Sequence, residues 1–133
     1  MKQIIWLVFF ILSVFTPAQS AASEKTMRLI CTFSHSIDQN SESSATSGNS
    51  LFTIKYTNKG SATIKKQDLD AIFYGTVTEE EINGETQYKI QDMLFVQTLN
   101  INRFTGSFSL SYGINESFIL HFGTCKPANE KIF

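Results

Sequence analysis

The sequence predicts an all-β fold: a single antiparallel meander of about eight short strands, forming a small barrel or sandwich with one terminal disulfide. Three observations predict it. Apolar and polar residues alternate over most of the chain after residue 26, and no long segment has a helical period. Short runs rich in Gly, Asn and Ser separate the alternating segments. Two cysteines, Cys31 and Cys125, lie near the two ends of the alternating region.

The N-terminal residues have the pattern of a secretory signal peptide. Lys2 supplies a positive charge, Ile4 to Phe15 form an apolar run, and small residues follow. The run is shorter than the ~20 residues that a membrane-spanning helix needs. We therefore expect cleavage after Ser20, or alternatively after Ala22. The remainder, residues 21–133, would be one β domain without an integral membrane segment, exported to the periplasm or the extracellular space.

The charge balance gives no support for a nucleic-acid partner. Removal of residues 1–20 takes away Lys2 and no acidic residue, so ten basic and twelve acidic residues remain. Nucleic acids and anionic membrane surfaces attract proteins with a strong basic excess. With a net charge near −2, the domain is expected to bind neither.

The two cysteines are expected to form one disulfide. In an exported protein, two cysteines most simply pair with each other. Two isolated cysteines lack the ligand spacing of a zinc site. A Cys31–Cys125 bond would close nearly the whole domain into one loop, which stabilises by up to ~4–5 kcal/mol in the chain-entropy description. It would also tie the first strand to the end of the last, as in a barrel whose first and last strands pair.

The first half of the domain is expected to contain three strands. Met27 to Ser34 and Leu51 to Thr57 alternate with period two, and Ala62 to Ile64 can pair back across the turn Asn58-Lys59-Gly60. Residues 37–50 are rich in Ser and Asn with almost no apolar content. This segment is therefore expected to be an exposed polar loop.

The next predicted element is a hairpin with its turn at Asn83-Gly84. The two residues lie between β-prone runs, Ala71 to Glu81 and Thr86 to Asp92. Asn-Gly is the strongest short hairpin signal, because a type I′ turn needs positive φ at both central residues.

The last part of the domain is expected to contribute the remaining strands. In the final strand, we expect Phe118, Leu120 and Phe122 to face inward, which would turn His121 toward solvent or the opposite surface. The expected strands cover Met93 to Val96, Leu99 to Phe104, Ser107 to Tyr112 and Ser117 to Gly123.

Several segments after residue 87 resemble those of a group of small exported proteobacterial proteins without a known activity. These proteins carry a signal peptide, a Cys in the first strand, a hairpin with an Arg-aromatic-Thr-Gly sequence and a Gly-x-Cys-Lys ending. The resemblance covers about the last third of the chain and, before that, only Cys31. It implies export and a β fold, and it implies no activity. The matching segments are Tyr88-Lys89-Ile90-Gln91-Asp92, Leu94-Phe95, Ile101-Asn102-Arg103-Phe104-Thr105-Gly106, Gly123-Thr124-Cys125-Lys126-Pro127-Ala128 and Lys131-Ile132-Phe133.

Few residues suggest chemistry. No segment matches a common nucleophile, metalloprotease or phosphate-binding motif. Histidine is the commonest acid–base group near neutral pH, and His35 and His121 could approach each other if the first and last strands pair. Arg103 could bind an anion, or it could lie over an aromatic ring or pair across the sheet. Gly106 would then occupy a backbone position that a side chain would crowd. We therefore name His35, His121 and Arg103 as a weak possible surface site and expect no catalytic residue, metal or cofactor.

The sequence thus predicts a non-enzymatic binding or interaction protein. Its partner would be another protein, contacted by loops or an exposed strand edge, or a small apolar ligand. Two alternatives remain open. One is a periplasmic protein that resembles lysozyme inhibitors, although Ser47-Gly48-Asn49-Ser50 lacks the Tyr of their inhibitory loop. The other is a lipocalin-like carrier with an internal cavity.

Overall fold

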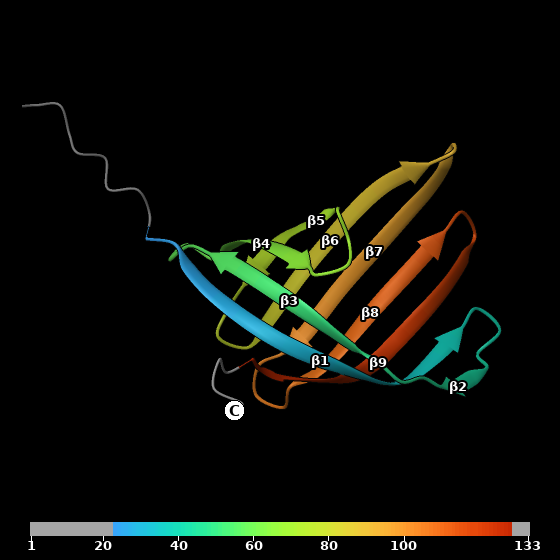
Figure 1. Cartoon of the computed structure of the whole chain (residues 1–133), viewed down its shortest axis with the longest axis horizontal. Coiled ribbons are helices and arrows are strands. Elements are labelled where there is room, and N and C mark those ends of the chain that lie inside the picture. Colours follow the sequence, from blue (N-terminus) through green and yellow to red (C-terminus); the bar gives the residue numbers. More distant parts are fainter. Residues whose placement is uncertain (1–22, 129–133) are drawn as a thin grey trace, which may run out of the picture.

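The computed structural model describes residues 23–128 and consists of antiparallel strands (Figure 1). From β3 to β9 the strand order follows the chain, and β1 pairs with both β3 and β9. Eight strands, all except β2, therefore close into a barrel, which confirms the predicted meander. The strands are β1 (Lys25–Asp38), β2 (Ser43–Ala45), β3 (Asn49–Tyr56), β4 (Ser61–Lys66), β5 (Ile72–Val77), β6 (Glu81–Ile90), β7 (Met93–Asn102), β8 (Ser107–Ile114) and β9 (Ser117–Pro127).

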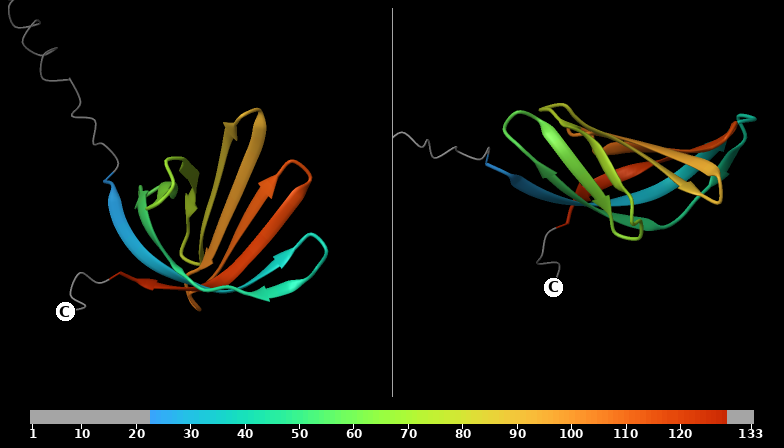
Figure 2. Two further views of the ribbon diagram at one scale, coloured as in Figure 1. Left: turned by 45° about the vertical axis from the view of Figure 1, so that its right-hand side comes forward. Right: turned by 90° about the horizontal axis from the view of Figure 1, so that it is seen from above.

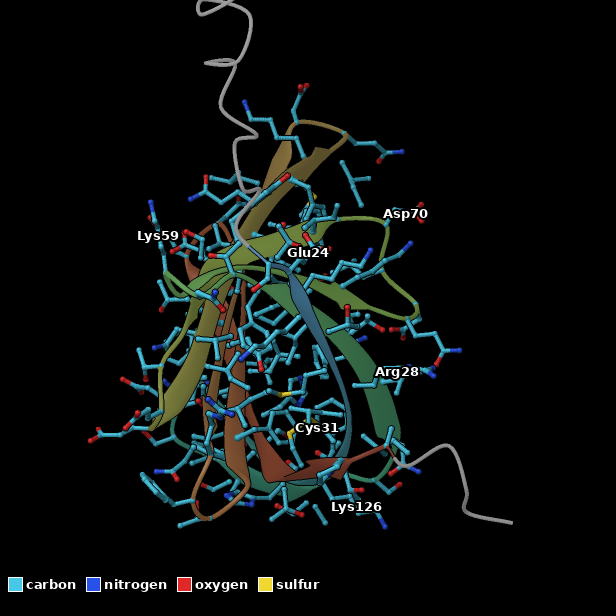
Figure 3. All side chains as sticks on the ribbon, turned by 90° about the vertical axis from the view of Figure 1, so that its left-hand side faces the viewer. Glu24, Arg28, Cys31, Lys59, Asp70 and Lys126 are labelled. Carbon is cyan, nitrogen blue, oxygen red and sulfur yellow. A yellow bond between two sulfur atoms is a disulfide. The ribbon has the colours of Figure 1, made fainter. Side chains whose placement is uncertain are left out.

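β1 and β9 close the barrel along an antiparallel ladder of nine residue pairs, with a bulge after Phe33. Cys31 and Cys125 lie directly opposite each other in this ladder and form a disulfide. The predicted bond between the first and last strands is confirmed. Figure 3 shows the sulfur of Cys31 inside the barrel and the side chain of Arg28 on the outer side of β1.

Alternate residues of seven strands, β1 and β3 to β8, fill the barrel with a continuous apolar core. In β1, β3 and β8 these are the residues whose period-two alternation predicts an inner face. Each large apolar side chain that is removed from water contributes about 1.5–3 kcal/mol. The core consists of Leu29, Cys31, Phe52, Ile54, Ala62, Ile64, Phe73, Val77, Ile82, Leu99, Ile101, Phe108 and Leu110.

The two ends of the barrel differ. At one end, which we call the turn end, the β5–β6 and β7–β8 turns are joined by a hydrogen bond from the Arg103 N–H to the Glu80 carbonyl (2.8 Å). At the other, the arm end, β6 and β7 extend beyond the start of the β5–β6 ladder at Tyr74–Glu85. We call this extension, residues 86–97, the arm (Figure 2). Inner-face residues near the arm end are only half-buried: Phe33, Tyr88, Phe95, Tyr112 and His121.

The predicted turn at Asn83-Gly84 is wrong, because both residues lie inside β6. The β6–β7 hairpin turns instead at Gln91 and Asp92, whose φ values are positive, 51° and 66°. Gly84 faces Gly75 of β5. The glycine signal therefore reflects close packing of two strands, and tertiary contacts override the local turn preference.

The predicted inner face of β9 is also wrong. Cys125 points into the barrel, so the residues two and four positions before it also face inward. His121 is therefore inside, opposite the core residue Leu110, whereas Phe118 faces outward and is 47% exposed. The apolar alternation of β9 belongs to its outer face.

Two further expectations need adjustment. The predicted loop at residues 37–50 is partly strand, because β1 extends to Asp38 and β2 pairs with its end. The two short strands expected at 93–96 and 99–104 form the single strand β7.

The predicted signal peptide lies outside the described residues. Within residues 23–128 there is no helix with the length and hydropathy to cross a membrane.

Candidate functional site

The three residues singled out in the sequence lie in three different places. His35 lies on the outer face of β1, where its ring stacks on Phe122 with 4.9 Å between centroids. His121 lies on the inner face of β9, opposite Ser36. The sheet itself separates the two imidazoles, so the pairing of β1 with β9 does not bring them together. Arg103 lies in the β7–β8 turn at the turn end.

His121 sits against the core edge. Its ring contacts Phe33 edge-on, with centroids 5.5 Å apart and planes inclined by 71°, and its Nδ1 is buried without a hydrogen-bond partner. Burial lowers the pKa of His121 below its usual value, and the positive charge of Lys66 lowers it further. Lys66 itself pairs with Asp68 (2.6 Å). His121 is thus neutral at pH 7 and packs against the core. Neither Phe33 nor the protonated Lys66 can accept a proton from it.

Residues 23–128 also contain no group of three or more His, Cys, Asp or Glu side chains that could hold one metal ion.

Aromatic side chains hold the inner face of the arm. Tyr88 and Phe95 stack in parallel across β6 and β7, with centroids 5.2 Å apart, and Phe95 also contacts Tyr112. Gln97, which is only 4% exposed, donates from Nε2 to the Tyr88 hydroxyl (2.8 Å). Burial raises the pKa of Tyr112, and its hydrogen bond with Tyr88 raises it further. These contacts link β6, β7 and β8 where β6 extends beyond its ladder with β5.

The outer edge of the arm is unpaired over residues 86–90 of β6. The ladder with β5 ends at the pair Tyr74–Glu85, whereas β7 accompanies β6 to Ile90. No other strand of the described chain pairs with this edge.

The direction of the backbone groups at this edge follows from the start of β6. The Glu81 carbonyl accepts a hydrogen bond from the Thr78 N–H (2.9 Å), so it points toward β5. In an antiparallel ladder, the backbone groups of successive residues point alternately to the two sides of the strand. Gln87 and Lys89 therefore present both N–H and C=O at the free edge.

A hollow of ≈ 490 Å³ lies beside this edge. On the β5 side it is lined by Ile72 and Tyr74, which are 41% and 66% exposed. On the β6 side it is lined by Glu85, Thr86 and Gln87. Unpaired backbone groups and exposed apolar side chains thus adjoin each other.

The sequence reasoning missed this site because it split β6 at Asn83-Gly84. The available signal was strand length. Read as one strand, Glu81–Ile90 is longer than Ile72–Val77, so part of it must lack a partner on that side.

A second pocket, of ≈ 280 Å³, lies at the turn end. Its apolar wall consists of Met27, Leu29, Ile82 and Ile101, and Arg103 also lines it. These residues come from three strands and a turn, so no local sequence pattern could have revealed the pocket.

Arg103 joins the two turns at this end. Its Nη1 donates to the Thr78 carbonyl (2.6 Å) in the β5–β6 turn. Arg103 thus has a structural contact between two turns, which differs from the aromatic or cross-sheet contact considered for it, and the same side chain borders the pocket. Gly106, three residues later, has φ 76°, and a Cβ there would lie 2.6 Å from the Cys125 carbonyl oxygen, which confirms that a side chain would crowd this position.

No protein-family model, curated protein or solved structure matches this chain. The candidate sites therefore rest on the geometry of the chain itself.

Proposed function

We propose that this protein is an exported, non-enzymatic binding protein that accepts an extended segment of another protein at the free edge of β6. The observation that carries the proposal is the unpaired edge at residues 86–90 beside the apolar hollow. Addition of a strand to an exposed sheet edge is a common mode of peptide recognition, in which backbone hydrogen bonds supply affinity and side-chain pockets supply specificity.

The edge offers enough groups for such a contact. Gln87 and Lys89 together present two N–H donors and two C=O acceptors, and each hydrogen bond contributes about 0.5–1.5 kcal/mol net. Alternate side chains of the added strand would project to the outer face. There they would meet Ile72 and Tyr74, whose apolar surface is exposed.

The charges along the edge would select the partner. Glu85, Gln87 and Lys89 alternate on the outer face of β6. A lysine on a free edge opposes non-specific pairing between strands. A partner segment with an acidic residue opposite Lys89 would overcome this, so the edge favours a defined segment over indiscriminate association.

The disulfide supports the assignment to export. Disulfides persist outside the reducing cytosol, and the Cys31–Cys125 bond fits a non-cytoplasmic environment. Together with the N-terminal sequence pattern, it favours a periplasmic or extracellular site of action.

The experiment has two steps: crosslinking to identify the partner, and then binding measurements on two substitutions of Gln87. A photo-crosslinking residue at position 87, compared with one at Thr63 on the fully paired strand β4, identifies the partner in cells. Binding of the purified partner is then measured for Gln87→Pro and Gln87→Ala. Proline removes the edge N–H and is tolerated where that group faces solvent, whereas alanine keeps the backbone intact.

We expect Gln87→Pro to weaken binding at least tenfold and Gln87→Ala to weaken it less than threefold, with both variants melting within a few degrees of the parent. Equal effects of the two substitutions, or full binding by Gln87→Pro, would contradict strand addition. The lysozyme-inhibitor alternative stays a separate prediction, which a lysozyme assay at micromolar protein tests.

A further inference from the structure

The pocket at the turn end has a preformed apolar wall. Leu29, Ile82 and Ile101 are at most 7% exposed and belong to the barrel core, and Met27 packs against that core. The disulfide residue Cys125 borders the same space. The wall is therefore fixed by the packing that stabilises the barrel, and the half-buried Met27 supplies more accessible apolar surface than the three core residues.

One cation, Arg103 from the β7–β8 turn, lies on the rim; Lys126 of β9 also borders the pocket, but its side chain alternates with that of Cys125 and points to the outer face. Lys126 lies at this end of the barrel, next to the disulfide (Figure 3). In the part of the chain that the structure describes, neither cation has a carboxylate within 4 Å, although Glu79 and Glu80 lie in the adjacent turn. The positive charge at the rim is thus not neutralised by a direct ion pair among these residues.

The position of Arg103 is well defined. Its backbone N–H donates to the Glu80 carbonyl (2.8 Å) and its Nη1 to the Thr78 carbonyl (2.6 Å). The Asn102 side chain accepts from the N–H groups of Phe104 (2.9 Å) and Thr105 (3.0 Å), which fixes the turn. A guanidinium carries five N–H donors, so donors other than the one on the Thr78 carbonyl remain for an anion.

We propose that this pocket binds a medium-chain carboxylate, with the carboxylate at Arg103 and the alkyl chain against Met27 and Leu29. The volume supports this size. A cavity of ~150 Å³ accommodates benzene. The ≈ 280 Å³ here would by the same scaling hold about eleven non-hydrogen atoms, enough for an eight-carbon carboxylate such as octanoate. An apolar wall with a few placed polar groups is the usual composition of a small-ligand site.

The test measures binding of octanoate to the protein without residues 1–20, by calorimetry and by amide chemical shifts. Two probes serve as ligand controls: octanol, which has the same chain without the charge, and butyrate, which has the charge with a shorter chain. Arg103→Gln removes the rim cation while keeping a donor for the Thr78 carbonyl. Arg28→Gln is the matched control, because Arg28 is exposed on the outer face of β1.

We expect saturable octanoate binding with shift changes at Gly106 and Cys125. Octanol and butyrate should bind at least fivefold more weakly. Arg103→Gln should lower octanoate affinity at least fivefold, and Arg28→Gln should leave it unchanged. Gln87→Pro should also leave it unchanged, since the pocket is independent of the β6 edge. Absence of saturation at 10 mM octanoate, equal affinity for octanol, or equal effects of the two arginine substitutions would overturn the proposal.

Discussion

Gly75 and Gly84 lie directly opposite each other across β5 and β6. This ladder has only four residue pairs, the fewest of any ladder in the barrel wall. A Cβ on Gly75 would overlap the carbonyl oxygen of Asn83, and a Cβ on Gly84 would lie 2.8 Å from the Ile64 Cδ1 atom. The shortest ladder of the barrel thus depends on two residues without side chains.

Substitution of these glycines should have unequal effects. Gly75→Ala should lower the free energy of unfolding by more than ~3 kcal/mol, because the obstructing atom belongs to the backbone of β6. Gly84→Ala should cost about 1–3 kcal/mol, since the end of the Ile64 side chain can move. Urea unfolding of both variants measures the difference. Equal losses, or a larger loss for Gly84→Ala, would contradict this account of the ladder.

Loss of the disulfide should weaken the closure of the barrel. The bond joins residues 94 positions apart, and its removal frees the unfolded chain from a long loop. We expect the double substitution Cys31→Ala and Cys125→Ala to lower stability by about 2–4 kcal/mol. Reductant should lower the melting temperature of the parent and leave that of the double variant unchanged. An unchanged melting temperature of the parent under reductant would refute the prediction.

His121 should make stability depend on pH between neutral and mildly acidic conditions. Its pKa is lower in the folded protein than in the unfolded chain, so in that window the unfolded chain binds more protons. Stability is then full above the unfolded value of about 6.5, falls as the pH decreases toward the lowered folded pKa, and becomes constant below it. His121→Phe should flatten the curve between pH 7 and pH 5. His35→Asn, which keeps His121, should retain the parental slope, and an equal flattening by both variants would count against this role.

The strength of the sequence pattern differs from strand to strand. In β1, β3 and β8, alternation predicts the inner face correctly, because inner positions are apolar and outer positions mostly polar, as at Phe108 and Leu110 between serines. In β9, the large apolar residues Phe118, Leu120 and Phe122 are on the outer face, and the inner positions are Gly123, His121 and Ile119. There the pattern points the wrong way, and only the position of Cys125 in the β1–β9 ladder indicates the true phase.

The sequence predicts the candidate sites less well than it predicts the inner faces of the strands. The sequence singles out Arg103, yet the apolar wall beside it comes from strands distant in sequence. Pairing of the first and last strands could bring His35 and His121 together, and it does bring their backbone positions close. The bulge after Phe33 and the alternation of side chains then placed them on opposite faces of the sheet.

By itself, the sequence determined the all-β meander, the core positions of several strands and the pairing of the two cysteines. These follow from local alternation and from the scarcity of alternatives for two cysteines. Only the tertiary structure decided where β6 leaves β5, which glycines mark close packing instead of turns, and which residues surround the turn-end pocket. Each of these depends on the pairing and packing of segments that are distant in the sequence, which no local pattern encodes.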